Sequence, residues 1–492
     1  RQMCIRDRGI TNPEDCPKAH FQDTLDAGRY LNDTRLVKIF VVSAPSLIGT
    51  LQKMGVPFKS ADDRLFQYRG AGHTFARGLQ VSDKAVTAGV SLVKPLIWIA
   101  RSLGVGFCEE MTIIDLVRDS DGVQGAIGLD RKKNRMIVVE AKSTVLCTGG
   151  LGQLYSNTNN PPGTIGDGYA MAIRAGARLV DMEFVQFYPF SICEPGLPRW
   201  NIGYEQVIDA GGTFVNEKGE NLLASQIQES CRTTRDRLAI AVASEIRRSG
   251  SVFLDLRNVT EDSWTTPPRI RKIKQRYGPR KKIRVAPIVH YFMGGIRTSE
   301  ECETDVCNLY AAGEVVGGIH GANRLNGNAL SEVLVFGAIA GRKASENAKS
   351  KLHQAVGEER MRSLAEEMLS LYEFKAEKKD YGKVKGMIRS VMWDNVGILR
   401  NKEGLEQALC LLRCASDESL PMVSIDDVAG MTDAVEIRNM LTVAEIVTGS
   451  ALKREESRGS HFRSDFPRED ENWLGNIEVS LERGQPCFEL HP

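Results

Sequence analysis

Hydrophobic and polar positions along the chain follow two different periods. From residue 20 to residue 56 the apolar positions recur at near-helical spacing, and the glycine and proline of GVPF end this pattern. Within residues 85–150 the pattern becomes that of strands, in MTIIDLVRD, GVQGAIGLDR and RMIVVEAKSTVLCTGG. We therefore expect helices in the first region and strands in the second.

The third of these strands is expected to run directly into Thr148, Gly149 and Gly150. A strand that enters a glycine turn is typical of α/β sheets that bring their backbone close to a nucleotide cofactor. The pattern returns further along the chain, where the strand-like CNLYAAGE precedes the helical ALSEVLVFGAIAGRKASENA. Between the two, GDGYAMAIRAG predicts a helix that continues through Arg174.

An insertion is expected to interrupt this α/β pattern. Residues 185–292 contain more aromatic residues, prolines and short strand-like runs than the segments around them. Residues 350–420 show the pattern of charged amphipathic helices. A chain of 492 residues is too long for a single hydrophobic core, so several structural units are expected.

Charge and hydropathy narrow the classes of partner. A formal net charge of +1 gives no general attraction to nucleic acid or anionic lipid. The nine Lys or Arg residues of RIRKIKQRYGPRKKIR, at 269–284, are therefore expected to form a solvated surface. The chain contains no run of about 18 apolar residues, so no direct membrane span is expected.

Cysteine usage bears on metals and on the redox compartment. The eleven cysteines are scattered and form no CxxC pair. This spacing argues against a zinc site, an iron–sulfur cluster or a disulfide framework within the chain. It suits a reducing compartment, so we expect a cytoplasmic protein without a metal site of its own.

Many segments, in one order from about residue 11 to residue 475, resemble the flavoprotein subunit of succinate dehydrogenase and fumarate reductase and its relative L-aspartate oxidase. The resemblance rests on AGHTFARGLQ, TVLCTGGLGQLYSNT, TIGDGYAMAIRAGARLVDMEFVQFYP, GGTFVNEKGE, TTRDRLA, APIVHYFMGGI, LYAAGE, HGANRLNGNAL, VFGAIAG and RNMLTVAEIVTGSALKREESRGSHFRSDFP. It implies an α/β fold: a discontinuous Rossmann-like FAD-binding domain (9–184 and 293–348), an inserted α+β capping domain (185–292), and a C-terminal helical domain with a tail (349–492).

The resemblance also implies which residues hold FAD. Glu314, which ends AAGE, corresponds to the glutamate that binds the ribose hydroxyls, and Asp167 corresponds to a further flavin contact. A carboxylate beyond a strand end is a natural acceptor for a diol. Asp167 could instead cap the helix expected to begin near Tyr169. The remaining implied cofactor contacts are the glycine turn Thr148, Gly149 and Gly150, and Asn328, Ala329 and Leu330, where the backbone approaches the isoalloxazine ring.

Substrate residues are implied in the same way. Arg324 corresponds to the family's carboxylate clamp, for which a guanidinium offers two parallel hydrogen bonds. His290 corresponds to the contact at the other end of a dicarboxylate, and the alternative is a packed histidine. Arg235 corresponds to the proton shuttle, in a pocket whose other cations could make it easier to deprotonate. Without the resemblance, an ion pair with Asp236 or a nearby glutamate would explain Arg235 equally.

Three departures from the family pattern limit how far these residue roles can be carried over to this chain. The strand, GxGxxG loop and helix that open the family are not found, so we expect the chain to be truncated at its N-terminus. The family's QFHP is QFYP, which places Tyr188 at a histidine position. A Thr-Glu pair becomes Tyr204-Glu205. Both pocket changes leave the identity of the dicarboxylate open.

Three hypotheses about function follow. The first is a flavin-dependent oxidoreductase that interconverts succinate and fumarate or a close analogue, with electrons passing to a separate iron–sulfur protein. The second is L-aspartate oxidase, which needs no such partner, and the third is a non-catalytic fragment. For the first we expect a cytoplasmic protein, or one held on the cytoplasmic face of the membrane by partner subunits.

Overall fold

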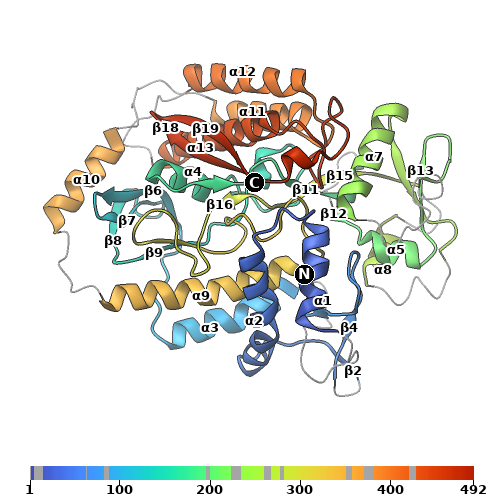
Figure 1. Ribbon diagram of the computed structural model, residues 1–492, viewed down its shortest axis with the longest axis horizontal. Helices are drawn as coiled ribbons and strands as arrows, with labels where there is room; N and C mark the ends of the chain where they lie inside the picture. The colour runs from blue at the N-terminus through green and yellow to red at the C-terminus, as the bar shows by residue number, and fades with distance from the viewer. Residues whose placement is uncertain are drawn as a thin grey trace.

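The structure is a computed structural model that combines helices with several separate sheets. It describes residues 2–4, 15–61, 64–81, 88–194, 200–222, 234–259, 268–277, 282–350, 357–370, 380–419 and 428–492. The first residues of the expected FAD-binding region, 9–14, and part of the basic run, 278–281, lie outside this range. Figure 1 shows α5 (Tyr204–Asp209), α7 (Arg235–Ser249) and α8 (Pro268–Tyr277) gathered at one side of the molecule.

The N-terminal helices form where the helical period predicts them. Helix α1 (Pro17–Ala27) begins with a proline, and α2 (Thr34–Lys53) is capped by the Asp33 side chain, which accepts from two backbone N–H groups. By length and composition α2 could cross a membrane, the one such helix in the described part of the chain. Its apolar face packs against α9 (Asn328–Ser350) in a shared hydrophobic cluster.

The strand region contains one helix and one break that the pattern did not predict. Residues 88–102, expected among the strands, form α3 (Ala88–Ser102), whose Leu92 and Leu96 pack four residues apart on a shared core. The meander β6 (Met111–Asp119), β7 (Gly122–Asp130) and β8 (Arg135–Glu140) is a three-stranded antiparallel sheet. The expected single strand to Gly150 divides, because β8 pairs with β7 while β9 (Thr144–Leu146) pairs in parallel with β17 (Leu309–Ala311).

The segment 185–292 supplies a sheet of its own. Its strand order is β12 (Trp200–Asn201), β11 (Val185–Ile192), β15 (Ile283–Phe292), β14 (Val252–Asp255) and β13 (Thr213–Asn216). A separate hydrophobic cluster, from Tyr188 to Ile288, fills the space between this sheet and α7. An independent core is what an inserted domain requires, although the expected boundaries remain a prediction.

The C-terminal region contains strands as well as the expected helices. Helices α10 (Glu358–Ser370), α11 (Tyr381–Asn395), α12 (Lys402–Ser419) and α13 (Val428–Lys453) are followed by the hairpin β18 (Asn476–Glu482) and β19 (Gln485–His491). Strand β18 pairs with β10 (Leu179–Val180), which pairs with β16 (Gly295–Ile296). The expected tail therefore completes a sheet with residues about 300 positions away, a pairing that local periodicity does not reveal.

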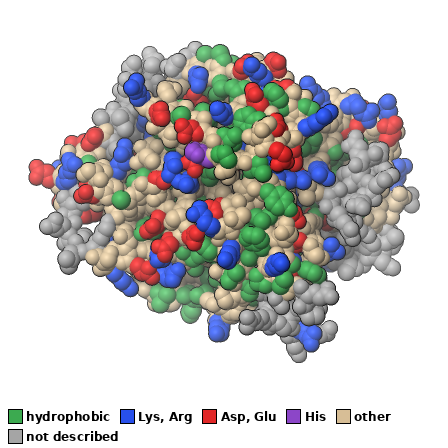
Figure 2. Space-filling view, in the orientation of Figure 1, with side chains coloured by type: hydrophobic (Ala, Val, Ile, Leu, Met, Phe, Trp, Pro, Cys, Tyr) green, Lys and Arg blue, Asp and Glu red, His purple; other side chains and the backbone are tan. Residues whose placement is uncertain are grey.

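The remaining elements are short, apart from one helix at the carboxyl side of β9. They are β1 (Gln2–Cys4), β2 (Ser60–Ala61), β3 (Arg64–Leu65), β4 (Gln67–Tyr68), β5 (Gly78–Gln80), the 3₁₀ turns Gly152–Leu154 and Glu471–Trp473, and α4 (Asp167–Ala175). On the face drawn in Figure 2, basic and acidic side chains are interspersed. This distribution agrees with the net charge of +1.

Candidate active site

The parallel pair β9 and β17 brings two predicted cofactor segments together. Thr148, Gly149 and Gly150 follow β9, and Glu314 follows β17, so all four lie beyond the carboxyl ends of neighbouring strands. Ligands of open α/β sheets bind in the crevice at this edge. Thr148 is exposed and Gly149 half-buried, which leaves this end of the strands accessible.

Close backbone packing explains the small residues at this edge. A Cβ on Gly150 would lie 2.3 Å from Glu314 Oε1, and one on Gly168 would lie 2.0 Å from Thr148 Oγ1. Gly149 adopts a φ of +77°, which disfavours a larger residue. The same packing fixes Glu314, whose Oε1 accepts from the Phe292 N–H at 3.1 Å. Glycines allow a ligand to approach the backbone closely, and the Glu314 carboxylate is held beside them. This arrangement is suited to binding a dinucleotide.

Asp167 has a different local role from the expected alternative. Helix α4 begins at Asp167 itself, with Gly166 as its N-cap, so Asp167 does not cap a helix that begins near Tyr169. Its Oδ1 accepts from Asn439 Nδ2 at 2.7 Å. Burial is the main reason that the pKa of Asp167 rises to about 6. A flavin contact at Asp167 remains a prediction.

The start of α9 is held by residues from α1. Asn328 Oδ1 lies 3.0 Å from the His20 ring nitrogen, and Asn328 Nδ2 donates to Thr24 Oγ1 at 3.1 Å. Burial and the charge of Arg77 lower the pKa of His20 to about 4, so the ring is neutral near pH 7. Ala329 and Leu330 are half-buried at the same helix start.

One buried acid in this region was not predicted from the sequence. Glu332 lies one turn into α9 and is completely enclosed. Burial, with the charge of Glu314, raises the pKa of Glu332 to about 8. An acid at position 332 falls within the helical pattern of apolar residues, and that departure from the pattern was its only signal in the sequence.

Arg235 is the first residue of α7 and is buried against three kinds of group. Its Nη2 donates to Asn326 Oδ1 at 3.0 Å and lies 3.9 Å from Glu205 Oε1. Its guanidinium carbon lies 5.3 Å from the centre of the Tyr188 ring, within range of a cation–π contact. The expected alternative of a glutamate partner is therefore present, through Glu205.

The charge around Arg235 corrects one expectation. Burial alone lowers the pKa of Arg235, but the negative charge of Glu205 and the nearby phenols outweigh it, so the net shift is upward. The prediction that other cations surround Arg235 and make it easier to deprotonate is wrong for the groups on this side of the site. Glu205 is 34% exposed at its side chain, so this carboxylate connects the buried guanidinium with solvent.

Tyr188 and Tyr204, the two departures from the family pattern, contact each other. The Tyr204 N–H donates to Tyr188 Oη at 3.3 Å, and the ring centres lie 5.7 Å apart. Both rings are buried. Burial, together with the charge of Glu205, raises the pKa of Tyr204 well above its usual value, so this phenol stays neutral. The pair therefore adds hydrogen-bonding groups to the pocket and no cation.

His290 sits at an irregularity of the central strand pair. Gln186 pairs with Tyr291 and Phe187 with Val289, so His290 is the extra residue of a β-bulge in β15. Bulges redirect side chains and are frequent beside active sites. The His290 ring centre lies 5.6 Å from that of Tyr188, and its Nδ1 lies 3.0 Å from Asn159 Nδ2. The bulge brings this histidine to Tyr188.

Arg324 is buried and held by residues that the sequence did not single out. Its Nη2 donates to Gln186 Oε1 at 2.7 Å, while Gln186 Nε2 donates back to the Arg324 carbonyl at 3.0 Å. The guanidinium carbon lies 4.5 Å from the centre of the Tyr291 ring. Gln186 belongs to the VQFYP segment, two residues before Tyr188, which was a signal for its position near the pocket.

Asn326 was also missed, and it connects the two arginines. It accepts the hydrogen bond from Arg235 and follows Arg324 by two residues in GANRLNG. Its carbonyl oxygen lies 2.7 Å from the His73 ring nitrogen. Its place inside a motif that carries a substrate arginine was the available signal.

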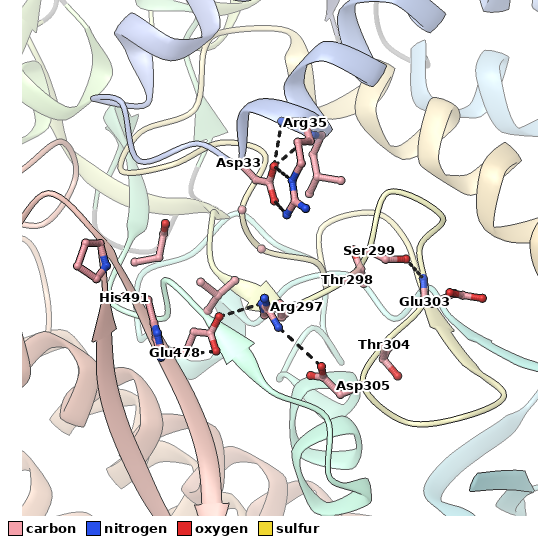
Figure 3. Close-up of a pocket in the computed structure, with 16 residues that line it drawn as sticks. Asp33, Arg35, Arg297, Thr298, Ser299, Glu303, Thr304, Asp305, Glu478 and His491 are labelled. Carbon is pink, nitrogen blue, oxygen red and sulfur yellow. Dashed lines mark hydrogen bonds and ion pairs between the residues drawn. The ribbon is translucent and has the colours of Figure 1, made fainter. Parts of the chain in front are cut away.

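A separate cavity of ≈ 500 Å³ lies elsewhere, between the start of α2, the loop after β16 and the C-terminal hairpin (Figure 3). Its charged side chains are largely paired: Arg297 Nε lies 2.8 Å from Glu478 Oε1, and Arg35 Nη2 lies 2.9 Å from Asp33 Oδ2. None of the predicted site residues lines it. With its arginines neutralised, this cavity is poorly suited to a dicarboxylate.

Two parallel strands that are followed by a glycine turn and a fixed carboxylate are typical of the class of dinucleotide-dependent α/β enzymes. Comparisons with known proteins narrow this class. Residues 4–330 match the FAD binding domain family, and residues 385–491 match the family described as fumarate reductase flavoprotein C-term.

Individual proteins agree with the family match. One component of the fumarate reductase (CoM/CoB) of Methanothermobacter marburgensis, named as a subunit of that enzyme, is 34% identical over 497 residues, covering 97% of this chain and 88% of that protein. L-aspartate oxidase of Nostoc sp. is 31% identical over 504 residues, covering 94% and 83%. Among solved structures, quinol fumarate reductase FrdA of E. coli gives a TM-score of 0.87 at 26% identity, covering 99% and 88%.

The chain therefore belongs to the family of FAD-dependent flavoproteins that contains the fumarate reductase and succinate dehydrogenase subunits. It has the fold of that family and is an FAD-dependent oxidoreductase of this kind. When bound, FAD would supply the redox chemistry, and the protein would supply binding and orientation.

Proposed function

We propose that the chain interconverts succinate and fumarate, or a closely related dicarboxylate, with FAD as the redox cofactor. The observation that carries this proposal is the hydrogen bond from Arg235 to Asn326, because Asn326 lies two residues from Arg324. It joins two segments almost 90 residues apart, each of which carries a buried arginine. Two fixed cations match the two carboxylates of such a substrate.

Each residue has a distinct part in this proposal. Arg324, held by Gln186, clamps one carboxylate, and His290 on its bulge contacts the other end. Arg235 delivers or removes the proton at the substrate carbon. Because the pKa of Arg235 is raised, the guanidinium regains a lost proton readily, and the Glu205 carboxylate, 3.9 Å away and 34% exposed, lies between it and solvent. The segments Thr148–Gly150 and Asn328–Leu330, with Asp167 and Glu314, would hold FAD.

L-aspartate oxidation is the second candidate. Tyr188, where the family has histidine, is the observation that favours it, because a phenol lacks the positive charge that would repel the substrate ammonium group. The Nostoc relative carries this name. The two candidates differ in the substrate that changes the oxidation state of the flavin.

The two functions also differ in their partners. For the first we propose that electrons pass to a separate iron–sulfur subunit, since the scattered cysteines provide no cluster motif, and the Methanothermobacter relative is itself one component of an assembly. A cytoplasmic location, with attachment to the membrane only through partners, completes this proposal.

The test is the visible spectrum of the chain with added FAD, without oxygen. Reduced flavin should be reoxidised by fumarate, or oxidised flavin bleached by succinate. Bleaching by L-aspartate alone would replace the proposal by the second candidate, and bound flavin that responds to none of the three would end both. In a companion variant, Arg324→Ala should raise KM and lower kcat, because a misplaced substrate loses its reactive geometry. Unchanged kinetics would remove Arg324 from the site.

A further inference from the structure

The turn between α1 and α2 has an unusual backbone. Arg29 and Tyr30 both have positive φ, at 55° and 61°. Consecutive non-glycine residues in this region are uncommon and cost about 1–3 kcal/mol each, so the surrounding structure must hold them. Backbone hydrogen bonds do so: the Gly28 N–H donates to Thr24 and the Tyr30 N–H donates to Leu25, each at 3.0 Å.

This turn is fastened to the segment that carries Arg324. The Gly28 carbonyl accepts from the Ala322 N–H at 2.9 Å, and Asn32 Nδ2 donates to the Ile319 carbonyl at 2.8 Å. A Cβ on Gly321 would lie 2.5 Å from the Gly28 oxygen. The two segments are in close contact, so Arg29 keeps a fixed position relative to the proposed substrate clamp.

The Arg29 side chain extends from this turn to the helix that carries Arg235. Its Nη2 lies 3.4 Å from Asp236 Oδ2, and Asp236 follows Arg235 in the first turn of α7. The Asp236 side chain is 2% exposed and that of Arg29 is 22% exposed. A second carboxylate, Glu469 Oε1, lies 3.9 Å from Arg29 Nε. Solvent screens a pair of this burial much less than a surface pair.

We propose that Arg29 is a positioning residue that holds the N-terminus of α7 against the Arg324 segment, and so sets where the Arg235 guanidinium meets the substrate. The catalytic consequence rests on the proposed function, whereas the mechanical link does not. Neighbouring residues of α7 make two separate connections: Arg235 bonds to Asn326, and Asp236 pairs with Arg29. The start of α7, packed through Leu238 and Ala239, is thus also fixed by two polar connections.

A plain structural ion pair is the competing explanation. It would stabilise the chain as a whole, and its loss would not act selectively on α7. The position of α7 matters because displacement of a reacting group by about 1 Å lowers a rate by about a hundredfold. Removal of Arg29 should therefore affect the order of one helix and the rate of one step, with substrate affinity largely retained.

Hydrogen exchange of the full chain tests the mechanical link. In Arg29→Ala, amides of residues 235–249 should exchange about fivefold faster or more, because the helix end opens locally. Arg35→Ala is the matched control, since Arg35 is an exposed arginine of the next helix, paired with Asp33. Unchanged exchange in α7, or an equal rise along the whole chain, would overturn the proposal. If Arg29→Ala does not fold, Asp236→Asn breaks the same pair from the other side.

Kinetics with FAD and the dicarboxylate form the second arm. Arg29→Ala should lower kcat about tenfold or more and change KM by less than about threefold, and Arg29→Lys should restore most of kcat. A KM effect alone would overturn the positioning role. If the unaltered chain turns over no dicarboxylate, the proposed function is wrong. The exchange measurement still tests whether Arg29 holds the N-terminus of α7 in place.

Discussion

Two regions of this protein bury arginines in opposite ways. In the C-terminal region, Arg454 is completely enclosed and donates to Glu183 at 2.6 Å, to Glu456 at 2.9 Å, and to the carbonyls of Trp473 and Gly475 at 2.8 and 2.7 Å. In the candidate active site, Arg235 donates to the neutral side chain of Asn326. The carboxylate of Glu205 is 3.9 Å away, and Arg235 Nε is buried without an acceptor among the described residues.

The difference supports the proposal that Arg454 has a structural role and Arg235 a functional one. A buried guanidinium whose donors are satisfied stabilises the chain and has little left to offer a ligand. Arg235 keeps donor capacity inside a largely dry pocket, where a substrate carboxylate would complete its coordination. Incomplete pairing costs stability, and a protein retains it where binding recovers that cost.

The largest expected effect tests the functional arginine. Arg235→Ala should lower kcat by about 10²–10⁴-fold, the usual loss when a positioned acid is removed. FAD binding should be retained, because none of the predicted cofactor residues lies on α7. Steady-state kinetics and flavin absorbance measure both. Loss of flavin in this variant would show that Arg235 is structural and would remove the contrast with Arg454.

The structural arginine should show the reverse behaviour. Arg454→Ala leaves the buried carboxylate of Glu183 unpaired and should lower the free energy of unfolding by about 3–5 kcal/mol. Urea denaturation monitored by circular dichroism measures this change. Arg235→Ala, measured in parallel, should change the same quantity by less than half as much. Equal losses of stability would mean that the two arginines are not of different kinds.

The buried acid Glu332 predicts how the stability of the candidate-site region depends on pH. Because the folded pKa of Glu332 is raised from 4.5 to about 8, the folded state binds more protons than the unfolded state in this window. Stability should therefore fall as the pH rises from 4.5 to 8, by up to about 1.4 kcal/mol per pH unit. Glu332→Gln should flatten this slope in urea titrations at several pH values. A slope that survives the substitution would belong to other groups.

The smallest expected effect concerns the tyrosine at the family's histidine position. Tyr188→Phe removes the oxygen that accepts from the Tyr204 N–H at 3.3 Å, a long hydrogen bond. The free energy of unfolding should fall by no more than about 1 kcal/mol. Thermal unfolding measures this value, and KM for the dicarboxylate measures any direct contact with substrate. A rise in KM above about tenfold would make Tyr188 a principal substrate ligand.

The comparison with the sequence shows which features were predictable. The helical period located α4 and the region that contains α1 and α2, and strand periodicity located β6 and β7 to within a few residues. The same reasoning missed α3 inside the strand region and joined β8 to β9. Both errors have one cause: short apolar runs are compatible with either element, and the sheet to which a strand belongs is decided by its partners.

The candidate site divides in the same way. Ordered motifs identified the family and the FAD cofactor, and they predict the roles of Arg235, His290 and Arg324, because these depend on residue type and order along the chain. Periodicity could not reveal the bulge that turns His290 toward Tyr188, since a bulge exists only in the pairing of two strands. Nor could it reveal the partners of Arg235, which are the acidic Glu205 on α5 and the neutral Asn326.

The sequence alone therefore determined the local elements, the family and the chemical groups available to the site. Only the tertiary structure decided how those groups are paired: Arg235 with Asn326, 91 residues away, and Arg29 with Asp236, 207 residues away. The physical reason is range. Helix and strand propensities act between near neighbours, whereas the environment of a buried charge depends on every segment that excludes water from it.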